Sequence, residues 1–203
     1  MKLTVTTLVS VDGVAQGPGG PEEDLSNGFS RGGWAASYFD EEAGRFVSEL
    51  FGRATMFLLG RKTYDMFAAS WPNATDPHDP VAKALNTLPK HVASTTLTDP
   101  TWQPTTVWGD VPAAVSDLKA RPGRELQVHG SIELVQTLLE HDLVDELNLL
   151  TFPVVVGEGR RLFSERGPDI ALSLSESRTT RSGIVIAVYR TTGRPEYGTV
   201  EVE

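Results

Sequence analysis

A direct junction between a strand and a helix near residue 60 constrains the fold more than any other feature of this chain. The run Met56–Leu59 is short and apolar, as a buried strand is. Directly after it, Tyr64, Phe67 and Trp71 lie at helical spacing on one face. A strand that passes straight into a helix is the repeating unit of α/β folds, and we therefore expect one here.

The residues of this junction are those of an anion site. Gly60 lets the backbone approach a ligand closely, and the first turn of a helix presents free N–H groups. Arg61 and Lys62 add two positive charges, and Thr63 adds a hydroxyl. Cations at this end oppose the helix dipole, so they mark either a solvated helix start or a bound anion. Two charges suit the extra 2′-phosphate of NADP better than the bare ribose of NAD.

A second junction repeats this chemistry. The strand over 125–128 runs into Gly130 and Ser131, ahead of a helix. Alone, a glycine turn with a serine N-cap explains the pair. Two such turns in one sheet instead suggest a pyrophosphate site, because ligands of open α/β sheets bind beyond the carboxyl ends of the strands. No GxGxxG motif is present, so a Rossmann fingerprint is not supported.

The remaining segments complete an alternating order. Asp40, with Glu41 and Glu42 in the first turn, predicts one helix start, and Asp110 predicts another. We expect further strands over 3–11, 90–96, 105–108 and 147–156, the last with Pro153 at a bulge or an edge, and a hairpin of 170–177 and 184–191. Segments 13–24 and 72–81 are predicted loops.

This order predicts the fold class. We expect an α/β fold with a mostly parallel central sheet, helices on both faces and an antiparallel hairpin at the C-terminal edge. The 203 residues favour one domain, over 1–192, followed by a polar tail over 193–203.

Composition excludes several functions. A net charge of −9 disfavours nucleic acid and anionic membranes as partners. The absence of cysteine excludes disulfides and thiolate chemistry, and the four histidines lack the spacing of metal ligands. No apolar run has the length of a signal peptide core or a membrane span, so we expect a cytoplasmic protein. GxSxG and HExxH motifs are also missing.

Five motifs in order resemble a known family. They are Val9–Gly13, Leu59–Tyr64, Val128–Ser131, Leu143–Leu147 and Pro153–Gly159. Together they resemble the dihydrofolate reductase-like superfamily. Within it the chain is most similar to stand-alone proteins related to the C-terminal reductase domain of the bacterial riboflavin biosynthesis protein. The resemblance runs from residue 3 to about residue 191.

The resemblance implies a dihydrofolate reductase fold, NADPH as the hydride donor and a homodimer, for which the apolar strand 147–156 is a candidate surface. The implied cofactor contacts are Arg61, Lys62 and Thr63 to the phosphates, Ser94 and Thr95 to the adenosine end, and Gly130, Ser131, Ile132 and Glu133 to the pyrophosphate. Loop 13–24 would close over the nicotinamide.

The substrate side matches the family less closely. Asp12 lies in a motif shared with the riboflavin-type reductases, near the expected substrate ring, and is a candidate proton donor. Trp34 and Phe39 supply either a stacking wall or ordinary core. Asp40 lies near the position where dihydrofolate reductases hold the pterin with an acid, without a clean match. The deaminase domain of the riboflavin enzyme and its zinc motif are absent.

Two functional hypotheses follow. The first is an NADPH-dependent reductase that transfers a hydride to a small pterin- or aminopyrimidine-like heterocycle. The alternative is a nucleotide- or ligand-binding module on the same fold, without turnover. A phosphate-binding hydrolase is disfavoured, because a nucleophile and metal ligands are missing.

Overall fold

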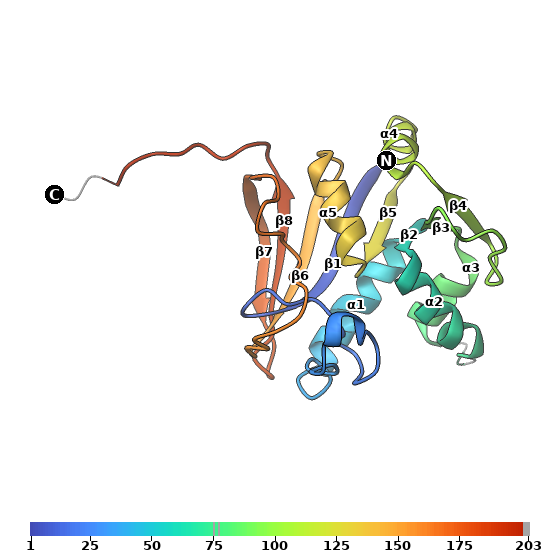
Figure 1. Cartoon of the computed structure of the whole chain (residues 1–203), viewed down its shortest axis with the longest axis horizontal. Coiled ribbons are helices and arrows are strands. Elements are labelled where there is room, and N and C mark those ends of the chain that lie inside the picture. Colours follow the sequence, from blue (N-terminus) through green and yellow to red (C-terminus); the bar gives the residue numbers. More distant parts are fainter. Residues whose placement is uncertain (75, 77, 201–203) are drawn as a thin grey trace.

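The chain forms one eight-stranded sheet (Figure 1). The computed structural model describes residues 1–74, 76 and 78–200. The strands lie in the order β4-β3-β2-β5-β1-β6-β8-β7. Their bounds are β1 (Lys2–Ser10), β2 (Met56–Gly60), β3 (Lys90–Ala93), β4 (Thr105–Trp108), β5 (Glu125–His129), β6 (Glu146–Phe152), β7 (Leu172–Thr179) and β8 (Val185–Thr191). Strands β1 to β6 are parallel, whereas β8 runs antiparallel to β6 and β7 antiparallel to β8, as predicted.

Helices cover both faces of this sheet, again as predicted. One face carries α1 (Glu41–Arg53), α2 (Arg61–Ser70) and α3 (Pro80–Thr87), and the other carries α4 (Val111–Lys119) and α5 (Ile132–Glu140). Two short 3-10 turns are η1 (Ser26–Gly28) and η2 (Trp71–Asn73). Along β2, Phe57 and Leu59 pack toward α1, α2 and α3, while Leu58 packs toward α5. Both faces of the central strands are therefore buried.

Helix starts follow the predicted caps, with one addition. Asp40 and Asp110 accept the backbone N–H of the residue three positions on, at 2.9 and 3.2 Å. Asp79 caps α3, a helix that was not predicted, by accepting the N–H of Val81 at 2.8 Å. The predicted loop 72–81 is therefore wrong at its end, where α3 begins with Pro80. Residues 75 and 77 of that loop lie outside the described residues.

Strand β6 differs from its prediction in length and in position. It ends at Phe152, and the N–H of Val154 donates to the carbonyl of Phe152 at 2.7 Å, so Pro153 follows the strand rather than forming a bulge or an edge. The strand lies between β1 and β8, and Leu147 and Phe152 are completely buried. These two side chains therefore offer no surface to a partner, whereas Val155, beyond the end of the strand, is 69% exposed. Strand β3 also ends early, at Ala93.

The C-terminal hairpin is confirmed. Strand β7 lies at the edge of the sheet, and all of its residues are exposed. The described part of the predicted tail, 193–200, leads away from the body of the molecule (Figure 1). Residues 201–203 lie outside the described residues.

Candidate functional site

The carboxyl ends of five parallel strands meet at one edge of the sheet. The end of β2 lies between those of β3 and β5, with β1 and then β6 beyond β5. Gly60 is paired with Ala93 at the end of β3, and Thr6 of β1 is paired with His129 at the end of β5. Most of the predicted site residues follow these strand ends. The fold therefore places these residues in a row along one edge of the sheet, in the strand order β3-β2-β5-β1-β6.

The two glycine turns contact each other. The N–H of Gly60 donates to Oγ of Ser131 at 2.9 Å, and that hydroxyl donates to Oγ1 of Thr63 at 2.7 Å. Ser131 has left-handed backbone angles (φ 64°, ψ 62°), and its side chain does not cap α5, so the predicted serine cap is wrong. Its hydroxyl joins the two turns instead. A left-handed residue followed by a helical one points successive N–H groups into a concavity that suits an anion.

The two cations of the first turn are already paired. Nε of Arg61 lies 2.9 and 2.8 Å from the two carboxylate oxygens of Asp65, one turn further along α2. This ion pair offsets part of the unfavourable interaction between Arg61 and the helix dipole. Nζ of Lys62 instead reaches the long loop between β1 and α1, called the N-terminal loop below. There it donates to Oγ of Ser26 at 3.2 Å and lies 3.7 Å from Oδ1 of Asp24.

Ser94 and Thr95 follow β3, next to the turn that holds Arg61. Oγ of Ser94 accepts the backbone N–H groups of Thr96 and Leu97, at 3.2 and 3.0 Å. Ser94 therefore shapes the turn after β3, and Thr95 is exposed beside it. Both residues lie beyond the end of β3, and β2 separates them from β5.

The first turn of α5 carries two predicted cofactor contacts, Ile132 and Glu133, whose side chains differ in exposure. The side chain of Ile132 is buried in the core, so only its backbone is available to a ligand. Glu133 is exposed, and its Oε1 lies 2.6 Å from Nη1 of Arg160. Arg160 was not among the predicted site residues, although it follows the Gly157–Gly159 motif.

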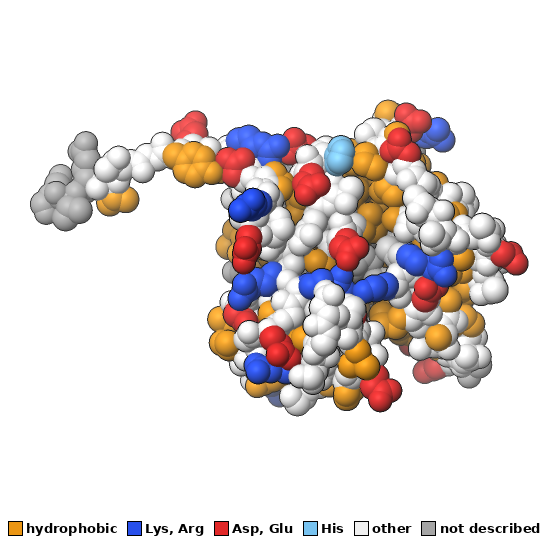
Figure 2. Space-filling view, viewed as in Figure 1, with side chains coloured by type: hydrophobic (Ala, Val, Ile, Leu, Met, Phe, Trp, Pro, Cys, Tyr) orange, Lys and Arg blue, Asp and Glu red, His pale blue; other side chains and the backbone are white. Residues whose placement is uncertain are grey.

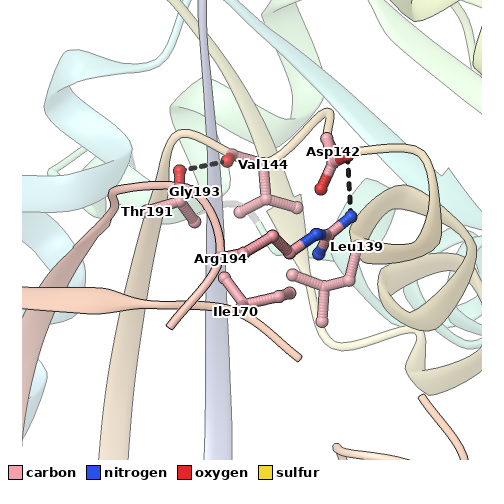
Figure 3. Close-up of a pocket in the computed structure, with 7 residues that line it drawn as sticks. All are labelled: Leu139, Asp142, Val144, Ile170, Thr191, Gly193 and Arg194. Atoms are coloured by element: carbon pink, nitrogen blue, oxygen red, sulfur yellow. Dashed lines mark hydrogen bonds and ion pairs between the residues drawn. The ribbon is translucent and has the colours of Figure 1, made fainter. Parts of the chain in front are cut away.

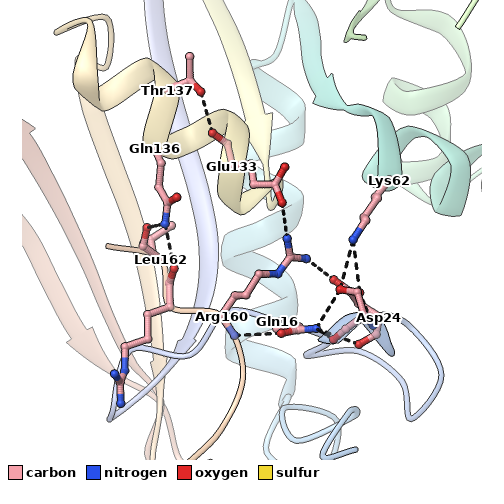
Figure 4. Close-up of polar contacts among 10 residues, drawn as sticks. Gln16, Asp24, Lys62, Glu133, Gln136, Thr137, Arg160 and Leu162 are labelled. Carbon is pink, nitrogen blue, oxygen red and sulfur yellow. Dashed lines mark hydrogen bonds and ion pairs between the residues drawn. The ribbon is translucent and has the colours of Figure 1, made fainter. Parts of the chain in front are cut away.

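The loop after β1 is held against the segment after β6. Val14 forms an antiparallel bridge with Arg161, and the N–H of Ala15 donates to the carbonyl of Arg160 at 2.9 Å. Oε1 of Gln16 accepts the N–H of Arg160 at 2.9 Å. These contacts lay the loop across the first turns of α2 and α5, where Arg160 and Lys62 converge on Asp24 (Figure 4). Lys and Arg side chains form a band across this face (Figure 2).

Asp12 anchors the segment after β6. Its carboxylate accepts hydrogen bonds from Oγ of Ser10 at 2.7 Å and from the N–H groups of Val156 and Gly157 at 2.9 and 2.8 Å. The Ser10 bond, helped by the two backbone bonds, lowers the pKa of Asp12 to about 2. The group is therefore ionised near neutral pH. This geometry favours a structural role and disfavours the predicted role of proton donor.

Of the two predicted stacking residues, Trp34 packs against the sheet, whereas Phe39 is exposed. Nε1 of Trp34 donates to the carbonyl of Gln16 at 2.8 Å, and its ring packs edge-on against Phe152, with centroids 5.6 Å apart. Trp34 therefore connects the N-terminal loop to the end of β6. Phe39 is 43% exposed and carries no comparable contact with the strand ends within the described residues.

Asp40 holds two parts of the fold together. Besides capping α1, its Oδ2 accepts the N–H and the hydroxyl of Ser182, at 3.0 and 2.8 Å. The hydrogen bond from Ala43, together with those from the β7–β8 turn, holds the pKa of Asp40 well below its usual range. Its hydrogen bonds join α1 to the hairpin. This arrangement disfavours the predicted substrate contact.

A row of polar side chains that was not predicted lies beneath α1. His129, Thr6 and Asn148 lie in register on β5, β1 and β6, and are 7%, 4% and 0% exposed. Nδ2 of Asn148 lies 3.3 Å from Oγ1 of Thr6, while its Oδ1 has no partner. Reversing the amide would leave the nitrogen unpaired instead. Because buried polar atoms are nearly always paired, this row is a candidate ligand contact.

Gln127 fixes the tautomer of His129. Its Nε2 donates to the carbonyl of Leu50 at 2.7 Å and to Oε1 of Glu125 at 2.9 Å, so its Oε1 is left to accept from Nε2 of His129 at 3.0 Å. Burial lowers the pKa of His129 to about 3, and the ring stacks on Phe51, with centroids 4.3 Å apart. The imidazole is therefore neutral, and Nδ1 is an acceptor.

The sequence profile of the RibD C-terminal domain matches residues 1–186. The chain belongs to this family. A relative, the uncharacterized protein YyaP of Bacillus subtilis (strain 168), is 30% identical over 148 residues, which cover 72% of this chain and 79% of YyaP. Family membership confirms the resemblance found in the sequence and supports a reductase-like role.

Solved structures share the fold. A putative riboflavin biosynthesis protein from Shewanella sp. PV-4 has a TM-score of 0.66 at 23% identity, covering 95% of this chain and 99% of its own. A pyrimidine reductase-like protein from Corynebacterium diphtheriae has a TM-score of 0.62 at 12% identity, with coverages of 94% and 92%. The predicted dihydrofolate reductase-like fold is therefore confirmed.

A pocket of about 350 Å³ lies away from these residues, beside the start of β6 and the end of β8 (Figure 3). Val144 and Leu139 contribute apolar surface, and Arg194 crosses it to pair with Asp142 at 2.9 Å. It contains none of the predicted site residues. Among the described residues, no helix combines the length and the apolar character needed to cross a membrane.

Proposed function

We propose that the chain is an NADPH-dependent reductase that transfers a hydride to a small pterin- or aminopyrimidine-like heterocycle. The observation that carries this proposal is the contact between Gly60 and Ser131, which joins two anion-binding turns at the carboxyl edge of the sheet. Membership of the RibD C-terminal domain family supports the reductase class.

The residues of this edge fit a dinucleotide. The first-turn N–H groups of α2 and α5 lack acceptors within their helices, and the left-handed Ser131 directs those of α5 into one concavity. Arg61, Lys62 and Thr63 would hold phosphate oxygens, and Ser94 would face the adenosine end. NADPH, when bound, supplies the hydride.

The substrate would lie between Trp34 and the polar row beneath α1. Nδ1 of His129 offers an acceptor, and the amide of Asn148 offers an unpaired polar atom. A flat heterocycle with two N–H groups on one edge would satisfy both acceptors, Nδ1 of His129 and Oδ1 of Asn148. Since Asp12 is ionised, the proton would come from water rather than from this carboxyl. The chain's task is to align donor and acceptor and to exclude bulk water.

A binding module without turnover is the second candidate. It is favoured by the positions of Asp12 and Asp40, because both carboxylates are fully engaged in hydrogen bonds that hold the fold together. No acid at the predicted positions is then left to hold or protonate a substrate.

A turnover assay separates the two candidates. The chain is mixed with NADPH and a panel of dihydropterins and pyrimidine ribosides, and the absorbance of the reduced nicotinamide is followed. Loss of this absorbance with at least one heterocycle supports the reductase. NADPH binding without oxidation across the panel supports the binding module, and failure to bind NADPH contradicts the reductase and a module for this nucleotide.

We also propose that the chain forms a homodimer, through the face of the C-terminal hairpin rather than through β6. Leu174 of β7 is 53% exposed and Val185 of β8 is 43% exposed. Register places both side chains on the same face as Ala187 and Tyr189. Exposed aliphatic side chains grouped on a sheet edge are typical of a surface that packs against a partner.

A further inference from the structure

Two cations from distant parts of the chain converge on one carboxylate. Lys62 lies in the first turn of α2, whereas Arg160 lies in the segment after β6. Nη2 of Arg160 pairs with Oδ2 of Asp24, and Nζ of Lys62 lies 3.7 Å from Oδ1 of the same residue (Figure 4). Asp24 therefore lies between the two positive charges.

Asp24 is held in place by its own loop. Its Oδ1 accepts the N–H and the hydroxyl of Ser26, at 3.1 and 2.5 Å. Its carbonyl oxygen accepts from Nε2 of Gln16 at 3.2 Å. Burial raises the pKa of Asp24, but the two hydrogen bonds from Ser26 and the Arg160 ion pair together outweigh it and lower the pKa below its ordinary value. The carboxylate is therefore ionised, and it lies across the space between the Gly60 and Ser131 turns, called the cradle below, where a bound anion would lie.

Arg160 retains a hydrogen-bond donor that the carboxylate does not use. Its Nη1 contacts Glu133 and its Nη2 contacts Asp24, but its Nε is buried and has no acceptor. A guanidinium binds phosphate best through two parallel N–H groups. A phosphate in place of Asp24 could take both Nε and Nη2, and could also accept from Lys62.

We propose that Lys62 and Arg160 form a phosphate site in the cradle, and that Asp24 occupies this site as an internal stand-in until a nucleotide displaces it. The inference rests on the proposed function, because the nucleotide is the cofactor named there. The site lies between the first turns of α2 and α5, so the group it takes is the pyrophosphate, which NADPH and NADH share. Asp24 thus competes with both nucleotides and couples their binding to movement of the N-terminal loop.

The test compares Asp24→Asn with Asp117→Asn. The two substitutions remove the same charge, but Asp117 is exposed on α4, away from the cradle. Affinities for NADPH, NADH and inorganic pyrophosphate are measured by calorimetry at low salt. Removing the competing carboxylate should tighten all three about tenfold in Asp24→Asn, with no comparable change in Asp117→Asn. Unchanged or weaker binding in Asp24→Asn would overturn the proposal.

A second binding measurement uses the variant Arg160→Ala. It should weaken pyrophosphate, NADPH and NADH about tenfold each, because all three share the group that Arg160 holds. Unchanged affinity in this variant would remove Arg160 from the site and overturn the proposal. The affinity for pyrophosphate distinguishes a failure of the phosphate site from a failure of the reductase proposal. If the chain binds pyrophosphate with these dependences but binds neither nucleotide, the phosphate site stands and the reductase proposal fails.

Discussion

The backbone N–H of Gly60 donates to Oγ of Ser131 across 71 positions of sequence, and this bond brings the two glycine turns together. A side chain on residue 60 would disturb it. A Cβ at Gly60 would lie 3.0 Å from both Cβ and Oγ of Ser131. The neighbouring turn therefore favours glycine at this position, because any larger side chain would have to displace Ser131.

Gly60→Ala should lower the free energy of unfolding by about 1–3 kcal/mol, because the two turns must separate to admit the methyl group. Urea denaturation measures this change. The matched control is Gly52→Ala in α1, where a Cβ would meet no atom within 4 Å. That variant should be stabilised by about 0.4–1 kcal/mol. Equal effects at the two positions would contradict the packing of the turns.

The stability of Asp12→Asn relative to the wild type should depend on acid pH. The native pKa of Asp12 is lowered to about 2 from an ordinary value of 3.8, so the ionised group stabilises the fold above the ordinary value. This contribution is lost as the pH falls from 3.8 toward 2. Thermal melts of both proteins should therefore differ near neutral pH and converge toward pH 2. A constant difference throughout would show that the Asp12 hydrogen bonds do not favour its ionised form.

His129 should make the chain less stable in mild acid. Its native pKa is lowered to about 3 from 6.5, so the unfolded chain takes up a proton below 6.5 while the native chain does not. Each such histidine reduces stability by up to about 1.4 kcal/mol per pH unit below that value. His91, with its pKa lowered by burial to about 4, adds a second contribution. Denaturation of His129→Gln between pH 6.5 and 4 should show a smaller slope than the wild type.

The variant Asn148→Leu should lose turnover while keeping its stability. An apolar side chain of similar size removes the unpaired amide oxygen but also removes the partner of the Thr6 hydroxyl, and these opposing effects should keep the free energy of unfolding within about 1 kcal/mol of the wild type. Turnover of any substrate found with NADPH should fall, while NADPH affinity stays constant. A large loss of stability would instead assign Asn148 a purely structural role.

Leu174→Lys should weaken the proposed homodimer. A charge placed on the exposed face of β7 cannot be buried against a partner without a large desolvation cost. Sedimentation of the wild type should give a dimer, and the variant should shift toward monomer at the same concentration. Lys substitution at Phe39, an exposed apolar residue outside the two hairpin strands, is the control. A monomeric wild type would contradict the proposal.

Local features of the fold were predictable from sequence, whereas contacts between distant segments were not. The Leu59–Gly60 junction and the cap at Asp110 depend on neighbouring residues, and both appear as predicted. Helix α3 was missed because prolines and acids upstream indicated a loop, although Asp79 followed by Pro80 is a typical helix start.

The candidate site was predicted in part, for the same physical reason. The glycine turns carry their own local chemistry, but the left-handed backbone of Ser131 accompanies a contact with Gly60, which is remote in sequence. The contact between Asp24 and Arg160 spans 136 positions and depends on the loop path. The polar row of Thr6 and Asn148 becomes visible only when the strand register is known.

The most direct measurement is a titration of NADPH and NADH into the wild type, Arg61→Ala and Lys62→Ala, with Lys83→Ala on the exposed face of α3 as the control. NADPH should bind more tightly than NADH. Loss of either cation should weaken NADPH by about 1.5–3 kcal/mol, and Lys83→Ala should bind like the wild type. Absence of NADPH binding, or equal affinity in all four proteins, would contradict the proposed cofactor site.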